Sequence, residues 1–204
     1  MPSMESLADL LQDELKDIYD AEKQLTKALP KMMKKATNSD LREAIEDHLN
    51  QTMQHIERLE QAFDQLGMPA RGKKCEGMQH LIAEGSDLIA EAEDEDARDA
   101  VMIAAAQKVE HYEIASYGTI RTWANLLGHN DVASLMEETL EEEKQTDQRL
   151  TTIAESFVNQ AAADEDDEEE ETMGRGGNRR ASATRRASTN PRSQLAADRK
   201  RRSR

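Results

Sequence analysis

Three glutamates stand in helical stripes that are otherwise apolar, at positions where an aliphatic side chain would be expected. Glu22 interrupts the first stripe of the chain, Glu110 the third and Glu143 the fourth. Burying an unpaired carboxylate in a helical bundle costs several kcal/mol, so the group must pair, take up a proton or bind a metal ion. The three glutamates therefore predict a polar site inside a bundle. The alternative is that each helix is rotated slightly and its glutamate reaches solvent.

Two pairs of residues have the spacing of neighbouring ligands on one helix face. Asp147 follows Glu143 by four residues, and His55 follows Gln51 by four residues, so each pair projects from one face, one turn apart. Oxygen ligands with an imidazole nitrogen suit Fe or Mn. A bundle that holds two such ions takes single glutamates from two helices, here Glu22 and Glu110 as bridging candidates, and paired ligands from the other two. The candidate metal ligands are Glu22, Gln51, His55, Glu110, Glu143 and Asp147.

Four long amphipathic helices are predicted to position these residues, because apolar side chains recur at steps of three and four. Pro30 is expected to kink or end the first helix. Asn38 and Ser39 are candidate caps of the second helix, and Asn130 can cap the fourth. Gly128 is expected to end the third. The predicted helices cover about residues 4–29, 39–66, 96–127 and 131–157.

The connections between these helices indicate the fold class. The first and second helices are joined by a short turn, as are the third and fourth, so each pair should be an antiparallel hairpin. Residues 68–95 are long enough to cross the length of a bundle, and residues 78–93 within them could form a short extra helix. Two hairpins joined by one long crossover are typical of the ferritin-like four-helix bundle. The sequence therefore predicts an all-α, ferritin-like domain over residues 1–160.

The last part of the chain differs in composition from the rest. Residues 164–171 are eight consecutive acids, and residues 174–204 hold eleven Lys or Arg with one acidic residue. Neither block has an apolar period, so residues 161–204 are predicted to be a disordered acidic-then-basic tail. The basic arm could bind DNA, RNA or an acidic surface by counterion release. The plainer interpretation of the arm, and of the R-R-A-S sequence that occurs in it twice, is a solvated basic segment.

The overall composition excludes several classes of protein. Aromatic residues make up 3% of the chain, and 9 Gly and 4 Pro are too few for the turns of a β-sandwich or barrel. One cysteine, Cys75, excludes an intrachain disulfide and a multi-cysteine zinc site. No apolar run approaches the roughly 20 residues that span a bilayer, and no secretory signal is visible, so we expect a cytoplasmic protein without membrane contact. The acidic body, in a chain of net charge −15, speaks against nucleic-acid binding by the bundle itself.

Five stretches of the predicted bundle carry a resemblance to a known family. They are D-I-Y-D-A-E-K-Q-L at 17–25, H-L-N-Q-T-M-Q-H-I-E-R-L-E at 48–60, K-K-C-E-G-M at 73–78, A-A-A-Q-K-V-E-H-Y-E-I-A-S-Y-G-T-I-R-T-W-A at 104–124 and L-M-E-E-T-L-E-E-E-K-Q-T-D at 135–147. Over about residues 5–160 the chain resembles the YciF/YciE-type ferritin-like proteins of bacteria, a domain of unknown function associated with stress responses. The resemblance implies a four-helix bundle, often a homodimer, with a dinuclear metal site between the helices and no settled reaction.

The chain departs from the family pattern in its second helix. The family usually has a Glu shortly before the Thr of that helix, whereas Asn50 and Gln51 precede Thr52 here. A neutral amide is a much weaker ligand than a carboxylate. We therefore expect two Fe or Mn ions, or one ion if Gln51 disables half of the centre.

Several neighbouring side chains have two interpretations. His48 is either a hydrogen-bond donor behind the ligands or a core histidine bonded to the backbone. Glu113, one turn from a candidate ligand, is either a reserve ligand or, as the pattern favours, a solvated side chain. Tyr19 and Tyr117 are either core residues or hydrogen-bond partners of the ligands, with core packing favoured, and His111 is expected on the surface.

The preferred hypothesis is a ferritin-like stress-response protein that binds two Fe or Mn ions and reacts with peroxide or O₂ at them. Peroxidase, catalase-like and ferroxidase chemistry are all compatible with the ligands, and the sequence does not select among them. The first alternative is a DNA-binding or DNA-protecting protein that uses residues 174–204. The second is a metal-free interaction bundle whose core carboxylates pair with cations, which the scarcity of basic residues near the stripes disfavours (Lys108 and Arg121 are the nearest on the third helix).

Overall fold

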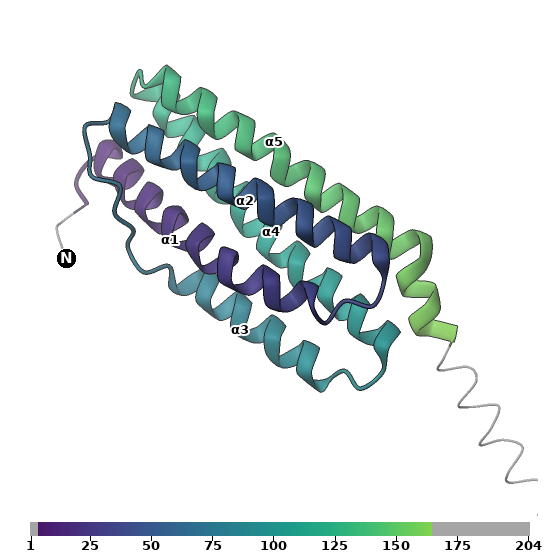
Figure 1. Cartoon of the computed structure of the whole chain (residues 1–204). Helices are drawn as coiled ribbons and strands as arrows, with labels where there is room; N and C mark the ends of the chain where they lie inside the picture. Colours follow the sequence, from purple (N-terminus) through teal and green to yellow (C-terminus); the bar gives the residue numbers. More distant parts are fainter. Residues whose placement is uncertain (1–3, 165–204) are drawn as a thin grey trace, which may run out of the picture. The chain divides into compact units, whose positions relative to one another are not determined.

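The computed structural model describes residues 4–164, which are almost entirely helical (Figure 1). The described part of the chain contains no β-strand, so the predicted all-α class is confirmed. The short helix predicted in the crossover is present as α3. The elements are α1 (Leu7–Met33), α2 (Ser39–Gln65), α3 (Glu76–Glu91), α4 (Glu95–Leu126), α5 (Asn130–Ile153) and the π-helical turn η1 (Ala154–Val158).

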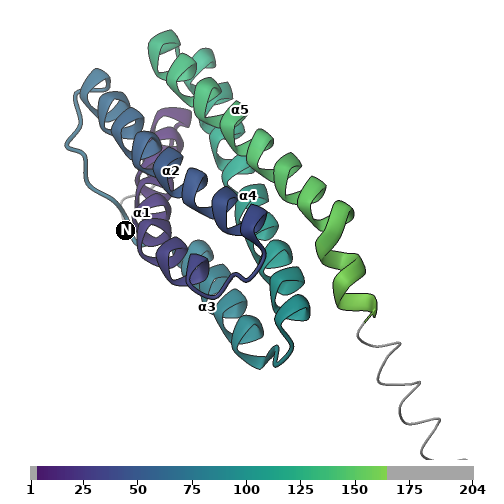
Figure 2. The ribbon, with the colours of Figure 1, turned by 45° about the vertical axis from the view of Figure 1, so that its right-hand side comes forward.

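Helices α1, α2, α4 and α5 form a four-helix bundle. Helix α1 packs against α2 and α4, and α5 packs against the same two helices, so α1 and α5 are diagonal to each other (Figures 1 and 2). Helix α3 lies outside the bundle, against α4 and α1. It carries the chain from the end of α2 back along the bundle to the start of α4 (Figure 1). Two hairpins joined by this crossover give the predicted ferritin-like topology.

Local sequence signals account for most helix ends. The Ser6 side chain accepts a hydrogen bond from the Asp9 backbone N–H, and the Asp9 carboxylate accepts one from the Ser6 N–H, so α1 begins with a capping box. Asn38 caps α2 as predicted. Gly128 follows α4 with a φ of 81°, a left-handed conformation that glycine adopts without steric cost.

Three predicted boundaries differ from the structure. Pro30 lies inside α1, which continues to Met33; the missing N–H removes only one hydrogen bond near the end of a long helix. The N-cap of α5 is His129 rather than Asn130, and its side chain makes no capping bond. After η1 the helix continues to residue 164, past the predicted end of the domain at residue 160. The rest of the predicted tail, residues 165–204, lies outside the described residues.

The core is aliphatic towards both ends of the helices and polar in the middle. On α1, Ile18 and Leu25 flank Glu22, and on α5, Leu140 and Leu150 flank Glu143; all six side chains are buried. Each stripe faces the core because its apolar positions share one side of the helix, and that side carries the glutamates inward with it. Within residues 4–164, no helix is both long and apolar enough to cross a membrane.

Candidate metal centre

Six potential ligands from the four helices of the bundle meet at mid-length of the core. Each of them is at most 4% exposed to solvent. Helices α1 and α5 contribute one each, and α2 and α4 contribute two each. They are Glu22, His48, His55, Glu110, Glu113 and Glu143.

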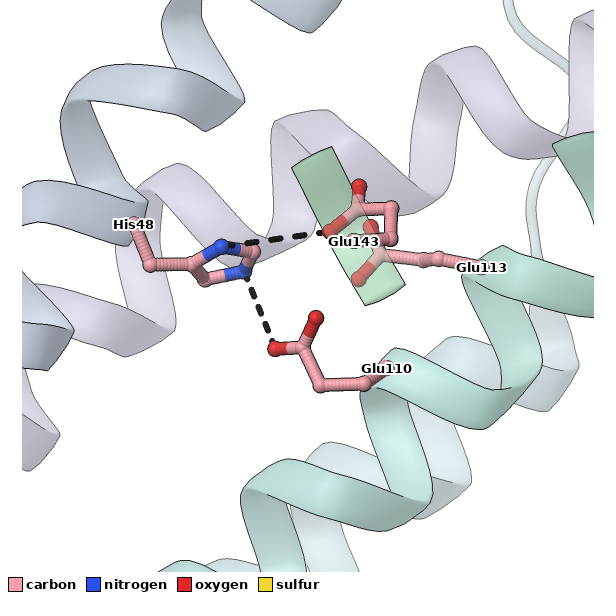
Figure 3. A group of neighbouring side chains, drawn as sticks. All are labelled: His48, Glu110, Glu113 and Glu143. Carbon is pink, nitrogen blue, oxygen red and sulfur yellow. Dashed lines mark ion pairs between the residues drawn. The ribbon is translucent and has the colours of Figure 1, made fainter. Parts of the chain in front are cut away.

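Four of these side chains form the first group, made of His48, Glu110, Glu113 and Glu143 (Figure 3). One ligand atom from each residue lies within 4.8 Å of those of the other three. His48 Nε2 is 3.3 Å from Glu110 Oε1, and His48 Nδ1 is 3.9 Å from Glu143 Oε2. Figure 3 shows Glu113 beside Glu143, with the imidazole of His48 facing them. Its four ligand atoms are enough to coordinate one cation.

The second group joins Glu22 and His55 to the same Glu143. His55 Nδ1 lies 3.0 Å from Glu143 Oε1 and 3.4 Å from Glu22 Oε1. Glu143 therefore turns Oε1 towards His55 and Oε2 towards His48. If each group held a cation, Glu143 could offer one carboxylate oxygen to each of them.

Buried polar atoms without a hydrogen-bond partner are concentrated in this place. Among residues 4–164, nine buried side-chain N or O atoms have no partner, and all nine belong to these six residues. His55 Nδ1 is close to two carboxylates, yet it forms no aligned hydrogen bond with either. Native proteins leave few such atoms unpaired, because each costs about 1–3 kcal/mol. Cations would satisfy the nine atoms together, so the donor set fits a metal centre.

An outer network holds the ring of His55. His55 Nε2 lies 2.9 Å from Glu142 Oε2, and Glu142 accepts two hydrogen bonds from Arg58, at 2.6 and 2.8 Å. Arg58, only 8% exposed, also donates to Thr139 Oγ1 at 3.1 Å. The network fixes Nε2 on the outer side and turns Nδ1 towards the centre. Metal-binding histidines commonly donate their second N–H to a carboxylate in this way.

The acids of the centre repel one another and are cut off from water. Burial raises the pKa of Glu110 and of Glu113 well above its usual range, and the charge of Glu143 raises both further. Burial also raises the pKa of Glu22, partly offset by His55. Without a cation, burial and mutual repulsion therefore favour the protonated forms of Glu110 and Glu113.

The two histidines are affected in opposite directions. Burial lowers the pKa of His48 and keeps its imidazole neutral, the form that binds metals. Burial also disfavours the charged form of His55, but the carboxylates of Glu142, Glu143 and Glu22 outweigh it and raise the pKa of His55 to about 12. A cation at Nδ1 would displace that proton, so metal binding here is coupled to proton release.

The structure brings four of the six predicted ligands together, namely Glu22, His55, Glu110 and Glu143. The other two lie beside the groups. Asp147 accepts a hydrogen bond from Gln107 Nε2 at 3.1 Å and lies 3.5 Å from His111 Nε2. Gln51 is half-buried and accepts a hydrogen bond from Thr146 Oγ1 at 3.3 Å. Thr146, not Asp147, is the buried residue at this turn of α5.

Two side chains left open by the sequence join the centre instead. Glu113 is 0% exposed, so the solvated position favoured for it is wrong. His48 contacts carboxylates of the first group, and both of its ring nitrogens lack a hydrogen bond, which excludes the backbone-bonded alternative. The signal was present in the spacing: His48 and His55 are seven residues apart on one helix face, and Glu113 is three residues from Glu110.

One of the two tyrosines contacts the centre and the other does not. The hydroxyl of Tyr117 donates a hydrogen bond to Glu22 Oε1, whereas that of Tyr19 bonds to Glu60 at 2.6 Å, away from the centre. His111 lies on the surface, as predicted, with 69% of its side chain exposed. Arg58 was not predicted from the sequence. It is the third residue after His55, and that spacing on one helix was its only signal.

Comparisons with known proteins agree with this architecture. Residues 6–163 match a family described as a domain of unknown function, DUF892. Protein YciF of Escherichia coli (strain K12) is 45% identical over 159 residues, which cover 78% of this chain and 96% of YciF. The resemblance seen in the sequence is thereby confirmed.

Solved structures show the same arrangement of helices. The crystal structure of the E. coli stress protein YciF has 46% identity and a TM-score of 0.74, covering 76% of this chain and 99% of that one. YcfI from Rhodopseudomonas palustris has 44% identity and a TM-score of 0.73, and the match covers 74% of this chain and 96% of YcfI. A two-domain protein from Anabaena variabilis, with DJ-1/ThiJ/PfpI-like and ferritin-like domains, shares the fold at 15% identity and a TM-score of 0.50. The match covers 92% of this chain and 42% of that protein. The chain therefore belongs to the DUF892 family, whose members share a ferritin-like helical fold.

Proposed function

We propose that this protein binds two Fe or Mn ions between α1, α2, α4 and α5 and uses them for redox chemistry on peroxide or O₂ in a stress response. The observation that carries the proposal is the group of nine buried N and O atoms without partners, all on six side chains in the middle of the core. A core of this kind is costly to keep unless something binds there. Membership of a family that includes the E. coli stress protein YciF supports the biological setting.

The positions of the donors favour two ions. His48, Glu110 and Glu113 would hold one ion, Glu22 and His55 the other, and Glu143 would bridge them. Four carboxylates balance the charge of two divalent cations while both imidazoles stay neutral. A single divalent ion would leave two negative charges buried in the core, which is unfavourable unless two protons remain.

The donor set also limits the kind of metal. Four oxygen ligands and two nitrogen ligands, with no thiolate, suit Fe or Mn better than a soft metal. Such ions, when bound, would supply the one-electron steps that peroxide and O₂ chemistry needs. The residues of the chain would orient the ligands: Tyr117 holds Glu22 by a hydrogen bond, and Glu142 with Arg58 fixes the ring of His55.

Metal content measured on the full chain tests this proposal. We expect elemental analysis of protein purified without chelator, or loaded with Fe(II) or Mn(II), to give about two ions per chain. Glu143→Ala should lose most of both ions, because the bridge belongs to both groups. Asp147→Asn is the matched control on the same helix and should keep both. No metal in the purified or the loaded wild type would overturn the proposal, and loss of metal in Asp147→Asn would overturn the ligand assignment.

Activity is then compared between loaded wild type and Glu143→Ala. The decay of hydrogen peroxide and the uptake of O₂ should both be measured, with free Fe(II) or Mn(II) at the same concentration as a baseline. Turnover above that baseline in the wild type, absent in the variant, is the expected result. A loaded wild type that consumes neither oxidant faster than the free ion would contradict the redox part and leave metal binding alone.

A second candidate function rests on the charge of residues 174–204, which hold eleven Lys or Arg and one acid. We propose that this arm binds DNA through its phosphates, which would make the binding strongly dependent on salt. Full-length protein should retard DNA in a gel at low salt, and a chain lacking residues 172–204 should not. Equal retardation by both chains would refute this candidate without affecting the metal centre.

A further inference from the structure

An apolar cavity lies mainly between α1, α3 and α4, with residues of α2 and α5 also in its lining, next to the candidate metal centre. Its volume is about 570 Å³, within the range of cavities that bind small molecules. Aliphatic side chains form most of its walls, among them Leu25 and Leu29 from α1, Ile82 and Ile89 from α3, and Val109 from α4. Helix α3 is therefore more than a connection, because it forms one wall of an apolar cavity that opens to the surface.

The inner end of this cavity reaches the first group of candidate ligands. His48 and Glu110 both line it, although they are only 4% and 1% exposed. Thr146 of α5 lines it as well. The residues around the cavity thus range from exposed to buried, so it leads from the surface to the centre. A molecule in it would lie beside His48 and Glu110.

The outer part of the cavity carries a row of positive charge. Lys27 and Lys31 on α1, and Lys35 just after it, line the cavity four residues apart, and all three are exposed. Within residues 4–164, none of the three lies within ion-pair distance of an acidic side chain. Although the chain has a net charge of −15, these three neighbouring cations, without acidic partners among the described residues, form a local positive site that attracts an anion.

We propose that this cavity binds a long-chain carboxylate, that is, a molecule of the fatty-acid class. Its hydrocarbon chain lies among the aliphatic side chains of α1, α3 and α4, and its carboxylate lies near Lys27, Lys31 and Lys35. A neutral hydrocarbon would use the walls but not the lysines, and a small anion would use the lysines but not the walls. Only an amphiphile with an anionic head matches both halves of the site.

This binding site goes beyond the proposed function and does not depend on it. The walls and the lysines are present without a metal ion, so metal-free protein should bind the ligand too. The proximity of the inner end to His48 and Glu110 links the two sites, because an occupant would lie next to these ligands and limit the access of water to them.

Isothermal titration of full-length protein with sodium dodecanoate below its micelle concentration tests the inference. We expect about one molecule bound per chain, in metal-free and in metal-loaded protein. 1-Dodecanol and dodecylammonium should bind at least tenfold more weakly, because they lack the negative head. Octanoate should also bind at least tenfold more weakly than dodecanoate, since each buried methylene strengthens binding by up to about fourfold. Equal binding of dodecanol, or no binding of dodecanoate, would overturn the inference.

Two pairs of variants locate the site. Lys27→Glu with Lys31→Glu should weaken dodecanoate binding by about tenfold, whereas Lys34→Glu with Lys74→Glu, which changes the net charge equally outside the cavity, should not. Ala106→Phe places a ring in the cavity and should abolish binding, while Ala104→Phe on the exposed face of α4 should leave it unchanged. Unaltered dodecanoate binding in both the Lys27→Glu/Lys31→Glu variant and Ala106→Phe would refute the proposed location of the site.

The outcome is separable from that of the metal experiment. A chain that holds two metal ions but does not bind dodecanoate would refute this inference and leave the proposed function intact. A chain that binds dodecanoate but no metal ion would do the reverse.

Discussion

Replacing Glu113 by methionine should stabilise the metal-free protein and weaken its response to metal. Both carboxylate oxygens of Glu113 are buried without a hydrogen-bond partner, and burial raises the pKa of this group well above its usual range. Methionine has a similar length and no polar oxygen, so Glu113→Met removes the unpaired group and opens little empty space. In metal-loaded protein, the same change removes a ligand of the first group.

The sizes of the two effects follow from the burial of Glu113. An unsatisfied buried polar group costs about 1–3 kcal/mol, so the free energy of unfolding of metal-free Glu113→Met should rise by about 2 kcal/mol. For a domain of this size, that corresponds to an increase in Tm of roughly 4–8 °C. Each ion at a hundredfold excess over its Kd adds about 2.7 kcal/mol. The wild type should gain two such increments from metal, and Glu113→Met only one.

Differential scanning calorimetry with EDTA, and then with Mn(II), measures both effects on the same samples. Glu57→Met is the matched control, because Glu57 is exposed on α2 and its replacement should change stability by less than about 0.5 kcal/mol. A lower Tm of Glu113→Met in EDTA would show that the carboxyl is well satisfied without metal. An unchanged metal-induced gain would show that Glu113 is not a ligand. Either result would refute the reasoning given for the first group.

Three further outcomes test the surroundings of the centre. Burial opposes ionisation of Glu142, but hydrogen bonds from His55 and Arg58 outweigh it and lower its pKa to about 2, from about 4.5 in the unfolded chain. In urea unfolding at pH 7, the free energy of unfolding of Glu142→Gln should therefore be lower than that of the wild type, by roughly 1 kcal/mol for this partly exposed group. The difference should shrink as the pH falls towards 2. A difference that is constant with pH would contradict this. Tyr117→Phe removes the hydroxyl donor to Glu22 and should lower the Tm of the metal-free protein by about 3–6 °C. An unchanged Tm would show that this hydrogen bond does not stabilise the metal-free protein. Calorimetric titration of Mn(II) at pH 7 in two buffers of different ionisation enthalpy should show net proton release, because the metal displaces protons held on Glu110, Glu113 and His55; equal heats in both buffers would contradict it.

The fold and four of the six residues of the centre could be predicted because most of their signals are local. Each of Glu22, Glu110 and Glu143 is an acid in the middle of an apolar stripe, and a stripe faces the core wherever its helix lies. The long crossover needed only a count of residues between two hairpins. These features depend on the spacing along one helix and on no contact between helices.

The positions of Asp147 and Glu113 depend on packing between helices instead. After Glu143, both Thr146 and Asp147 continue the stripe, since steps of three and four are equally compatible with a helix. Only the position of α5 between α2 and α4 decides that Thr146 is buried and that Asp147 turns to Gln107. The solvated position favoured for Glu113 was wrong for a related reason: α4 is covered by α1, α3 and α5 together, so it buries a wider face than a single stripe predicts.

The amide at position 51 need not reduce the number of metal ions. Because an amide is a weaker ligand than a carboxylate, Gln51 in the place of a ligand predicts one ion as an alternative to two. In the structure, Gln51 bonds to Thr146. The first group takes two of its acids, Glu110 and Glu113, from α4 and the third, Glu143, from α5. Four carboxylates are thus present without any from α2, which contributes its two histidines. The charge in the core matches two divalent ions, and we expect Gln51→Ala to keep two metal ions per chain, whereas loss of one of them would restore Gln51 as a ligand.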